Sequence, residues 1–126
     1  MSRTNTGWKV LGRTVIGSNP WVRSEVWQVR HSSFQPGRVE DYTIHCEYDY
    51  IQVVGYTKDG QAILITQDRV ANGISLEAVA GGIGPGETPE QAAIREWLQE
   101  SGWQCEELIF LRSSVPQTDR IVSRTP

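Results

Sequence analysis

The chain has 126 residues, a length typical of one domain, and 38% of them are hydrophobic, which is enough to form a core. Its formal net charge of −3 gives no general attraction for nucleic acid or anionic membranes, so neither is expected as a partner. No apolar stretch approaches the length of a membrane span, and the first ten residues lack the apolar core of a signal peptide, so we expect a cytoplasmic protein.

The N-terminal part of the chain predicts antiparallel strands. Gly12 interrupts the first strand and indicates a bend or bulge there. Turn residues follow at 18–20, and a second turn at 35–38 predicts a hairpin. The expected strands are residues 8–16, 21–31 and 42–50.

The middle of the chain is also strand-rich, with β-branched and aromatic residues in short runs. Lys58-Asp59-Gly60 is typical of a hairpin turn, and residues 70–73 are expected to form a loop. The expected strands are residues 48–57, 61–69 and 74–81, and the last of them leads into a glycine-rich turn.

One helix is predicted over residues 89–101. Thr88 is a suitable N-cap, Pro89 suits the first helical position, and Gln91 completes a capping box. Gly102 can adopt the left-handed conformation that ends a helix. After the helix, residues 105–115 predict another strand, and residues 116–126 predict a loop with the start of a further strand. This order favours an α+β fold.

Carboxylates gather on one face of the predicted helix. Glu96 and Glu100 are four residues apart, so they share that face and repel each other. A divalent cation would turn this repulsion into binding, because Mg²⁺ takes carboxylate oxygens, waters and substrate phosphates as ligands. The alternative is an ordinary solvated acidic face.

The cysteines and histidines indicate no second metal site. Cys46 and Cys105 stand in different segments, and we expect buried free thiols, with a disulfide as the alternative. His31 and His45 have no metal-ligand spacing with them and are expected on strand surfaces.

The stretch from 81 to 103, GGIGPGETPEQAAIREWLQESGW, resembles the Nudix box, the signature of hydrolases that act on nucleoside diphosphates linked to another moiety. Two features depart from the usual pattern: Gln99 stands where the family has a third metal-binding glutamate, and two tryptophans replace smaller aliphatic residues. The matching residues at the box spacing are Gly81, Glu87, Arg95, Glu96, Glu100 and Gly102.

Two upstream segments, QDR at 67–69 and LEAVAGGIGPGE at 76–87, look like the ADP-ribose pyrophosphatase branch of this family. The resemblance implies a Nudix-type α/β/α sandwich with a mixed sheet over residues 47–126, shortened at the C-terminus. It also implies that the N-terminal β region, residues 1–46, is a dimerisation element, so we expect a homodimer.

By the same resemblance, the reaction is hydrolysis of a pyrophosphate linkage with Mg²⁺ or Mn²⁺. Glu96 and Glu100 would be metal ligands, the backbone carbonyl of Ala80 another, and Glu87 an outer ligand or an orienting group. Arg95 is expected to hold Glu87 through an ion pair, rather than to contact substrate.

Substrate contacts are expected from two further residues. Arg69 is a candidate for binding phosphate, because guanidinium groups pair with phosphate in a bidentate manner; the alternative is a surface arginine at a strand end. Glu77 is a candidate contact to the nucleoside end of the substrate, with ordinary placement on a strand face as the alternative.

Gln99 supplies a carbonyl oxygen without charge, so we expect one metal ion at Glu96 and Glu100 and weak binding of any other. Asp119 is the one acid near the region where the family places a later catalytic glutamate. Three interpretations follow: a Mg²⁺-dependent hydrolase of a substrate such as ADP-ribose, a catalytically weak nucleotide-binding protein, or a structural dimerisation fragment.

Overall fold

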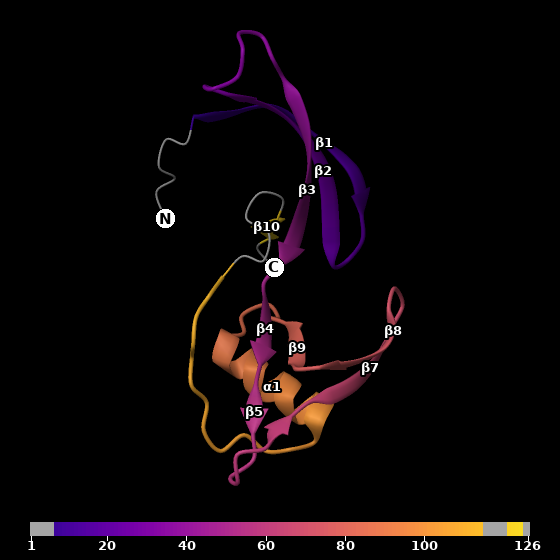
Figure 1. The fold of residues 1–126 in the computed structure, drawn as a ribbon, viewed down its shortest axis with the longest axis vertical. Helices are drawn as coiled ribbons and strands as arrows, with labels where there is room; N and C mark the ends of the chain where they lie inside the picture. The colour runs from indigo at the N-terminus through magenta and orange to yellow at the C-terminus, as the bar shows by residue number, and fades with distance from the viewer. Residues whose placement is uncertain (1–6, 115–120, 125–126) are drawn as a thin grey trace. The chain divides into compact units, whose positions relative to one another are not determined.

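The computed structural model describes residues 7–114 and 121–124. These residues belong to two compact units, one formed by residues 7–48 with 114 and 121–124, and the other by residues 49–113 (Figure 1).

The first unit is a four-stranded sheet in the order β1-β2-β3-β10. Both β1–β2 and β2–β3 are antiparallel, whereas β10 runs parallel to β3, so the sheet is mixed. A register shift between Val10 and Gly12 confirms the predicted irregularity in the first strand. The strands are β1 (Trp8–Ser18), β2 (Val22–His31), β3 (Glu40–Tyr48) and β10 (Ile121–Arg124).

The buried side chains of this sheet include a carboxylate, Glu25, beside Val29, Ile44 and Cys46. A buried charge must be paired, and both oxygens of Glu25 are engaged by its neighbours along β2. They accept hydrogen bonds from Arg23 Nε at 2.8 Å and Trp27 Nε1 at 2.6 Å. The Trp27 hydrogen bond is the largest cause that lowers the pKa of Glu25, so the charge is a stable part of this core.

The second unit contains three antiparallel strand pairs and the helix. The pairs are β4 with β9, β5 with β6, and β7 with β8. The predicted turn at residues 58–60 joins β5 to β6. The bounds are β4 (Tyr50–Val53), β5 (Gly55–Tyr56), β6 (Ala62–Ile63), β7 (Ile65–Arg69), β8 (Gly73–Glu77) and β9 (Val79–Gly82).

Helix α1 (Pro89–Ser101) has the predicted bounds and caps. The Thr88 side chain accepts from the Gln91 N–H, the Gln91 side chain accepts from the Thr88 N–H, and Gly102 ends the helix with φ 75°. These contacts satisfy backbone groups that the helix itself leaves unpaired. The helix therefore starts and stops where local chemistry dictates.

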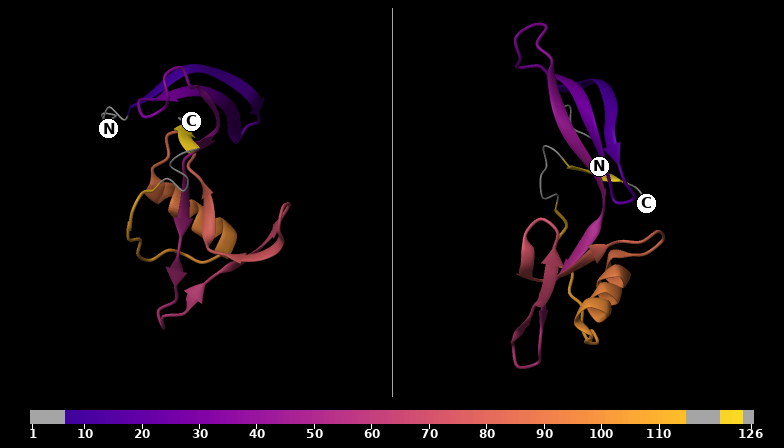
Figure 2. Two further views of the ribbon diagram at one scale, coloured as in Figure 1. Left: turned by 45° about the horizontal axis from the view of Figure 1, so that its top comes forward. Right: turned by 90° about the vertical axis from the view of Figure 1, so that its right-hand side faces the viewer.

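One face of α1 packs on β9 and β4 (Figure 2). The buried residues of the helix are Ala92, Ala93 and Trp97. Trp97 fits because its partner is a glycine: a Cβ on Gly55 would overlap the Trp97 ring. This contact fixes the rotation of α1 about its axis, which points the carboxylate face of the helix toward β9.

The prediction of a strand over residues 105–115 is wrong for the described part, because residues 102–114 carry no regular secondary structure. A strand needs a neighbour to pair its backbone groups, and no strand of the described residues pairs with this segment. The strand expected near the C-terminus is present at residues 121–124; Asp119 lies outside the described residues.

Three other predicted strands are each divided. The segment predicted over 48–57 contains the end of β3 and then β4 and β5, with a break at Val54. Residues 61–69 contain β6 and β7 with a break at Leu64, and residues 74–81 lie in β8 and β9 with a break at Ala78. The α+β fold class is confirmed, with the one helix of the described residues set against strands. Both cysteines are free thiols; Cys46 is buried, and Cys105 is half-buried. Across the described residues, the helix is too short and too polar to span a bilayer.

Candidate active site

Two carboxylates of α1 lie against the backbone of β9. Glu96 occupies the space that a side chain at position 81 would need, since a Cβ on Gly81 would overlap its carboxyl group. Glu100, one turn later, accepts a hydrogen bond of 3.3 Å from the Ala80 N–H to its Oε2 atom. Helix and strand thus bring Glu96 and Glu100 to the backbone of residues 80 and 81, and the group of Ala80 that meets Glu100 is its N–H.

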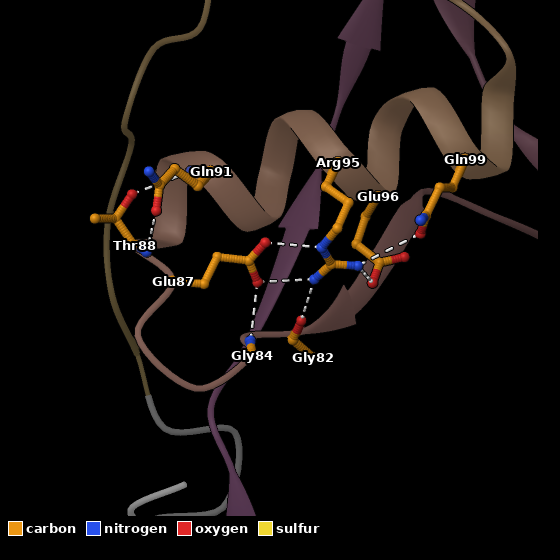
Figure 3. A network of polar contacts seen from close by, with 8 residues as sticks. All are labelled: Gly82, Gly84, Glu87, Thr88, Gln91, Arg95, Glu96 and Gln99. Carbon is orange, nitrogen blue, oxygen red and sulfur yellow. Dashed lines mark hydrogen bonds and ion pairs between the residues drawn. The ribbon is translucent and has the colours of Figure 1, made fainter.

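Arg95 joins the glycine-rich loop to the helix (Figure 3). Its Nε donates to Glu87 Oε1 at 2.7 Å and its Nη2 to Glu87 Oε2 at 2.9 Å, a bidentate ion pair. Nη2 also donates to the Gly82 carbonyl at 2.9 Å. The expected ion pair between Arg95 and Glu87 is therefore present, and it holds the loop onto the helix.

Glu87 is further fixed by the loop backbone, because the Gly84 N–H donates to Glu87 Oε2 at 2.9 Å. The hydrogen bonds from Arg95 and from Gly84 lower the pKa of Glu87 to about 2. Hydrogen bonds to a charged form favour that form, so Glu87 is ionised throughout the neutral and weakly acidic range. Both oxygens of Glu87 are therefore engaged by groups of this chain.

The third guanidinium nitrogen of Arg95 turns toward the carboxylate face. Nη1 lies 2.5 Å from Glu96 Oε1 and 3.4 Å from Gln99 Oε1. The same side chain therefore contacts oxygens of Glu87, Gly82, Glu96 and Gln99 (Figure 3). Glu87, followed by Glu96, raises the pKa of Arg95, which stays protonated.

Arg69 and Glu77 meet each other on the β7–β8 hairpin. Arg69 Nε donates to Glu77 Oε2 at 2.8 Å, and this hydrogen bond is the largest cause that lowers the pKa of Glu77. Figure 1 shows the turn of this hairpin pointing away from α1. The structure thus brings these two predicted substrate residues to one another.

Two backbone groups that contact Glu87 and Arg95 were not predicted from the sequence. They are the Gly84 N–H, which donates to Glu87, and the Gly82 carbonyl, which accepts from Arg95. Their signal was the GGIGPG loop, whose glycines permit close backbone approach. The side chains brought together around α1 are Glu87, Arg95, Glu96, Gln99 and Glu100.

The donor set determines which metal ion could fit. Within residues 7–114 and 121–124, no three or more His, Cys, Asp or Glu side chains are placed to hold a metal ion together. The pair Glu96 and Glu100 remains, seated on β9 with backbone groups beside it. Mg²⁺ is commonly held by one or two carboxylates, with waters and substrate phosphates completing its shell, so the residues present fit one such ion.

The surroundings of Arg95 also indicate that this part of the site suits a cation. Its guanidinium is a cation surrounded by carboxylate, amide and carbonyl oxygens, so this part of the site already accommodates positive charge. Hard divalent cations take ligands of the same kind.

A glycine loop held by an arginine of a capped helix, with glutamates one turn apart on that helix, defines a Nudix-type site. The family model of the NUDIX domain matches residues 50–124, which is more than half of the chain. The chain therefore belongs to the NUDIX domain family, and the prediction of a Nudix hydrolase family member is confirmed.

Among solved structures, the chain is similar to a crystal structure of an ADP compounds hydrolase, with a TM-score of 0.76 and 24% sequence identity. The match covers 97% of this chain and 65% of the other, so the chain spans about two thirds of the length of that protein. The similarity shows that the two share a fold. No curated protein matches the chain.

Proposed function

We propose that the protein hydrolyses the pyrophosphate linkage of a nucleoside diphosphate derivative such as ADP-ribose, with Mg²⁺ or Mn²⁺ as cofactor. The observation that carries this proposal is the seating of Glu96 and Glu100 against β9, beside the ion pair of Arg95 and Glu87. This arrangement presents oxygen ligands on a rigid element, as a metal-dependent hydrolase requires.

In this proposal Glu96 and Glu100 hold the cation, and the backbone carbonyl of Ala80 is a further ligand. A bound divalent cation would neutralise charge on the diphosphate and lower the pKa of the attacking water. Arg95 is a positioning residue: its bonds to Glu87 and to the Gly82 carbonyl keep the loop and the carboxylates in register.

For the substrate, we propose that Arg69 binds phosphate and that Glu77 contacts the nucleoside end. The ion pair between them supports a shared role, because Glu77 orients the guanidinium of an arginine side chain that is 48% exposed. The similar crystal structure is that of a hydrolase of ADP compounds, which favours an ADP-containing substrate as the first to test.

A catalytically weak nucleotide-binding protein is the second candidate. The observation that favours it is the engagement of Glu96 Oε1 by Arg95, together with a neutral side chain at Gln99. Both reduce the negative charge available to a catalytic metal ion.

The deciding experiment incubates purified protein with ADP-ribose and Mg²⁺ and measures AMP by chromatography, with EDTA as the control. Production of AMP that EDTA stops supports the hydrolase. Binding of ADP-ribose by calorimetry without AMP supports the nucleotide-binding candidate. Absence of both contradicts the two proposals and favours a structural role.

We also propose that residues 1–46 form the interface of a homodimer. Exposed apolar side chains on β1 support this, since a surface strand of this kind is commonly covered by a partner. The exposed set is Trp8, Val10, Leu11, Val15 and Ile16. Light scattering after size-exclusion chromatography tests it, and a monomeric mass would contradict it.

A cytoplasmic location is part of the proposal, because the two free cysteines suit a reducing compartment. Cell fractionation tests it.

A further inference from the structure

The turn of the β7–β8 hairpin contains an asparagine directly followed by a glycine, Asn72-Gly73. Both residues are exposed, and Figure 1 shows this turn at the free end of the hairpin. Gly73 has φ 71°, a left-handed conformation that favours glycine. A Cβ built on Gly73 would meet nothing within 4 Å, so the space beside this residue is open.

The side chain of Asn72 is not held in place. In the part of the chain that the structure describes, residue 72 makes its hydrogen bond through the backbone, where its N–H donates to the Arg69 carbonyl at 3.2 Å. Asn19 differs in this respect, because its Oδ1 accepts from two backbone N–H groups at 2.9 Å each. The amide group of Asn72 can therefore rotate toward the backbone nitrogen that follows it.

An asparagine amide can be attacked by the backbone nitrogen of the next residue. That nitrogen loses its proton and bonds to Cγ, the side-chain nitrogen leaves as ammonia, and a succinimide ring forms. Water then opens the ring at either of its carbonyl carbons, which gives aspartate or isoaspartate. A glycine in the next position favours the attack, because no Cβ hinders its nitrogen and its backbone rotates readily into the required geometry.

We propose that Asn72 is a modification site, at which spontaneous deamidation through the Gly73 nitrogen produces aspartate or isoaspartate. The reaction consumes water and releases ammonia, and it places a negative charge at the turn. In isoaspartate the backbone runs through Cβ, so an extra atom separates the two residues. The pairing of Arg69 with Gly73 across the hairpin cannot keep its register with this atom inserted.

The modification is independent of the proposed function, since it requires only the turn itself. Its effect on substrate binding would rest on that function, because the same hairpin carries Arg69 and Glu77.

The other asparagines provide internal comparisons. Asn19 is followed by Pro20, which has no backbone N–H to lose. Asn5 is followed by Thr6, whose branched side chain hinders the attack. Selective conversion at Asn72 is therefore expected.

The test ages the intact protein at neutral pH and physiological temperature in water enriched in heavy oxygen, then digests it with trypsin in ordinary water. Cleavage after lysine and arginine places each asparagine in its own peptide, residues 4–9, 14–23 and 70–95. Conversion in the intact protein adds about 3 Da to the last peptide, whereas conversion during digestion adds about 1 Da. Fragment ions separate Asn72 from Gln91 in this peptide, and methylation by an isoaspartyl methyltransferase identifies isoaspartate.

We expect the peptide 70–95 to gain heavy oxygen progressively, while the peptide 14–23 stays unmodified. Asn72→Gln is the matched control, since it keeps an amide but places the amide carbon one bond further from the Gly73 nitrogen. We expect no conversion at position 72 in this variant.

A peptide 70–95 that gains no heavy oxygen in the aged protein would overturn the inference. The same protein aged in guanidinium chloride would then show whether the folded hairpin is what protects Asn72. Equal conversion in Asn72→Gln would assign the reaction to another residue and would also contradict the proposal. Hydrolysis of ADP-ribose is measured separately, so none of these results depends on the proposed function.

Discussion

Arg95 holds both carboxylate oxygens of Glu87, with Nε 2.7 Å from Oε1 and Nη2 2.9 Å from Oε2. The two residues come from different elements, the glycine-rich loop and helix α1, so this ion pair links them. Because Arg95 precedes Glu96 directly, the link also constrains the first of the proposed metal ligands.

The pH dependence of this ion pair follows from the lowered pKa of Glu87, which falls from 4.5 to about 2 on folding. A carboxyl group with a depressed folded-state pKa stabilises the protein fully above its unfolded value, and the contribution is lost as the pH falls through the folded value. We expect the stability difference between wild type and Glu87→Gln to be constant above pH 4.5 and to shrink between pH 4.5 and about 2. Urea unfolding at a series of pH values measures it. A difference that does not change with pH would contradict the assignment.

Replacing a proposed ligand should abolish metal-dependent turnover while keeping the fold. Glu100→Gln retains the shape of the side chain and an oxygen acceptor for the Ala80 N–H, but removes the charge. Changes to groups that merely support metal ligands cost about 10- to 100-fold, so we expect the loss to exceed about 100-fold. The measurement is AMP release from ADP-ribose with Mg²⁺, and Glu90→Gln, a change at an exposed acid in the first turn of α1, is the control. Full activity in Glu100→Gln would exclude it as a ligand.

Substitutions of the adjacent residues Gly81 and Gly82 test the position of the Glu96 side chain against β9. A Cβ on Gly81 would overlap the Glu96 carboxyl group, whereas a Cβ on Gly82 would meet nothing within 4 Å. The flexible glutamate can move aside, so we expect Gly81→Ala to fold but to bind Mn²⁺ about tenfold more weakly. Gly82→Ala should bind as the wild type does. Equal affinities in the two variants would show that Glu96 does not need its place on β9.

The contribution of the Thr88 N-cap to the free energy of unfolding should be measurable with a pair of substitutions. Thr88→Ala removes the acceptor for the Gln91 N–H and is expected to lower the free energy of unfolding by about 1 kcal/mol. Thr88→Ser keeps the hydroxyl group and should retain most of the stability. Urea unfolding followed by tryptophan fluorescence gives both values, and equal losses would assign the effect to the methyl group instead.

Sequence reasoning succeeded where the determining contacts are local. Helix α1 begins and ends at its predicted residues, because Thr88, Gln91 and Gly102 each act within a few positions of their partners. The pairing of Arg95 with Glu87 was also expected, because the resemblance to the Nudix box implies it.

The errors concern contacts between distant segments. Residues 105–114 have the composition of a strand, but no strand of the described residues pairs with them. Composition cannot decide whether a segment finds a partner, because pairing depends on the whole sheet. The contact of Arg95 with Glu96 and Gln99 was missed for a related reason, as a flexible side chain can reach several partners from one position.

The contact between Gly55 and Trp97 has a consequence for how this sequence can vary. Since any Cβ at position 55 would meet the indole ring, the two positions are restricted as a pair. A relative with alanine or serine at position 55 is expected to carry a smaller side chain at 97, and a relative that keeps tryptophan at 97 is expected to keep glycine. Substitutions at these positions should therefore covary across the family, although the residues lie on a strand and a helix far apart along the chain.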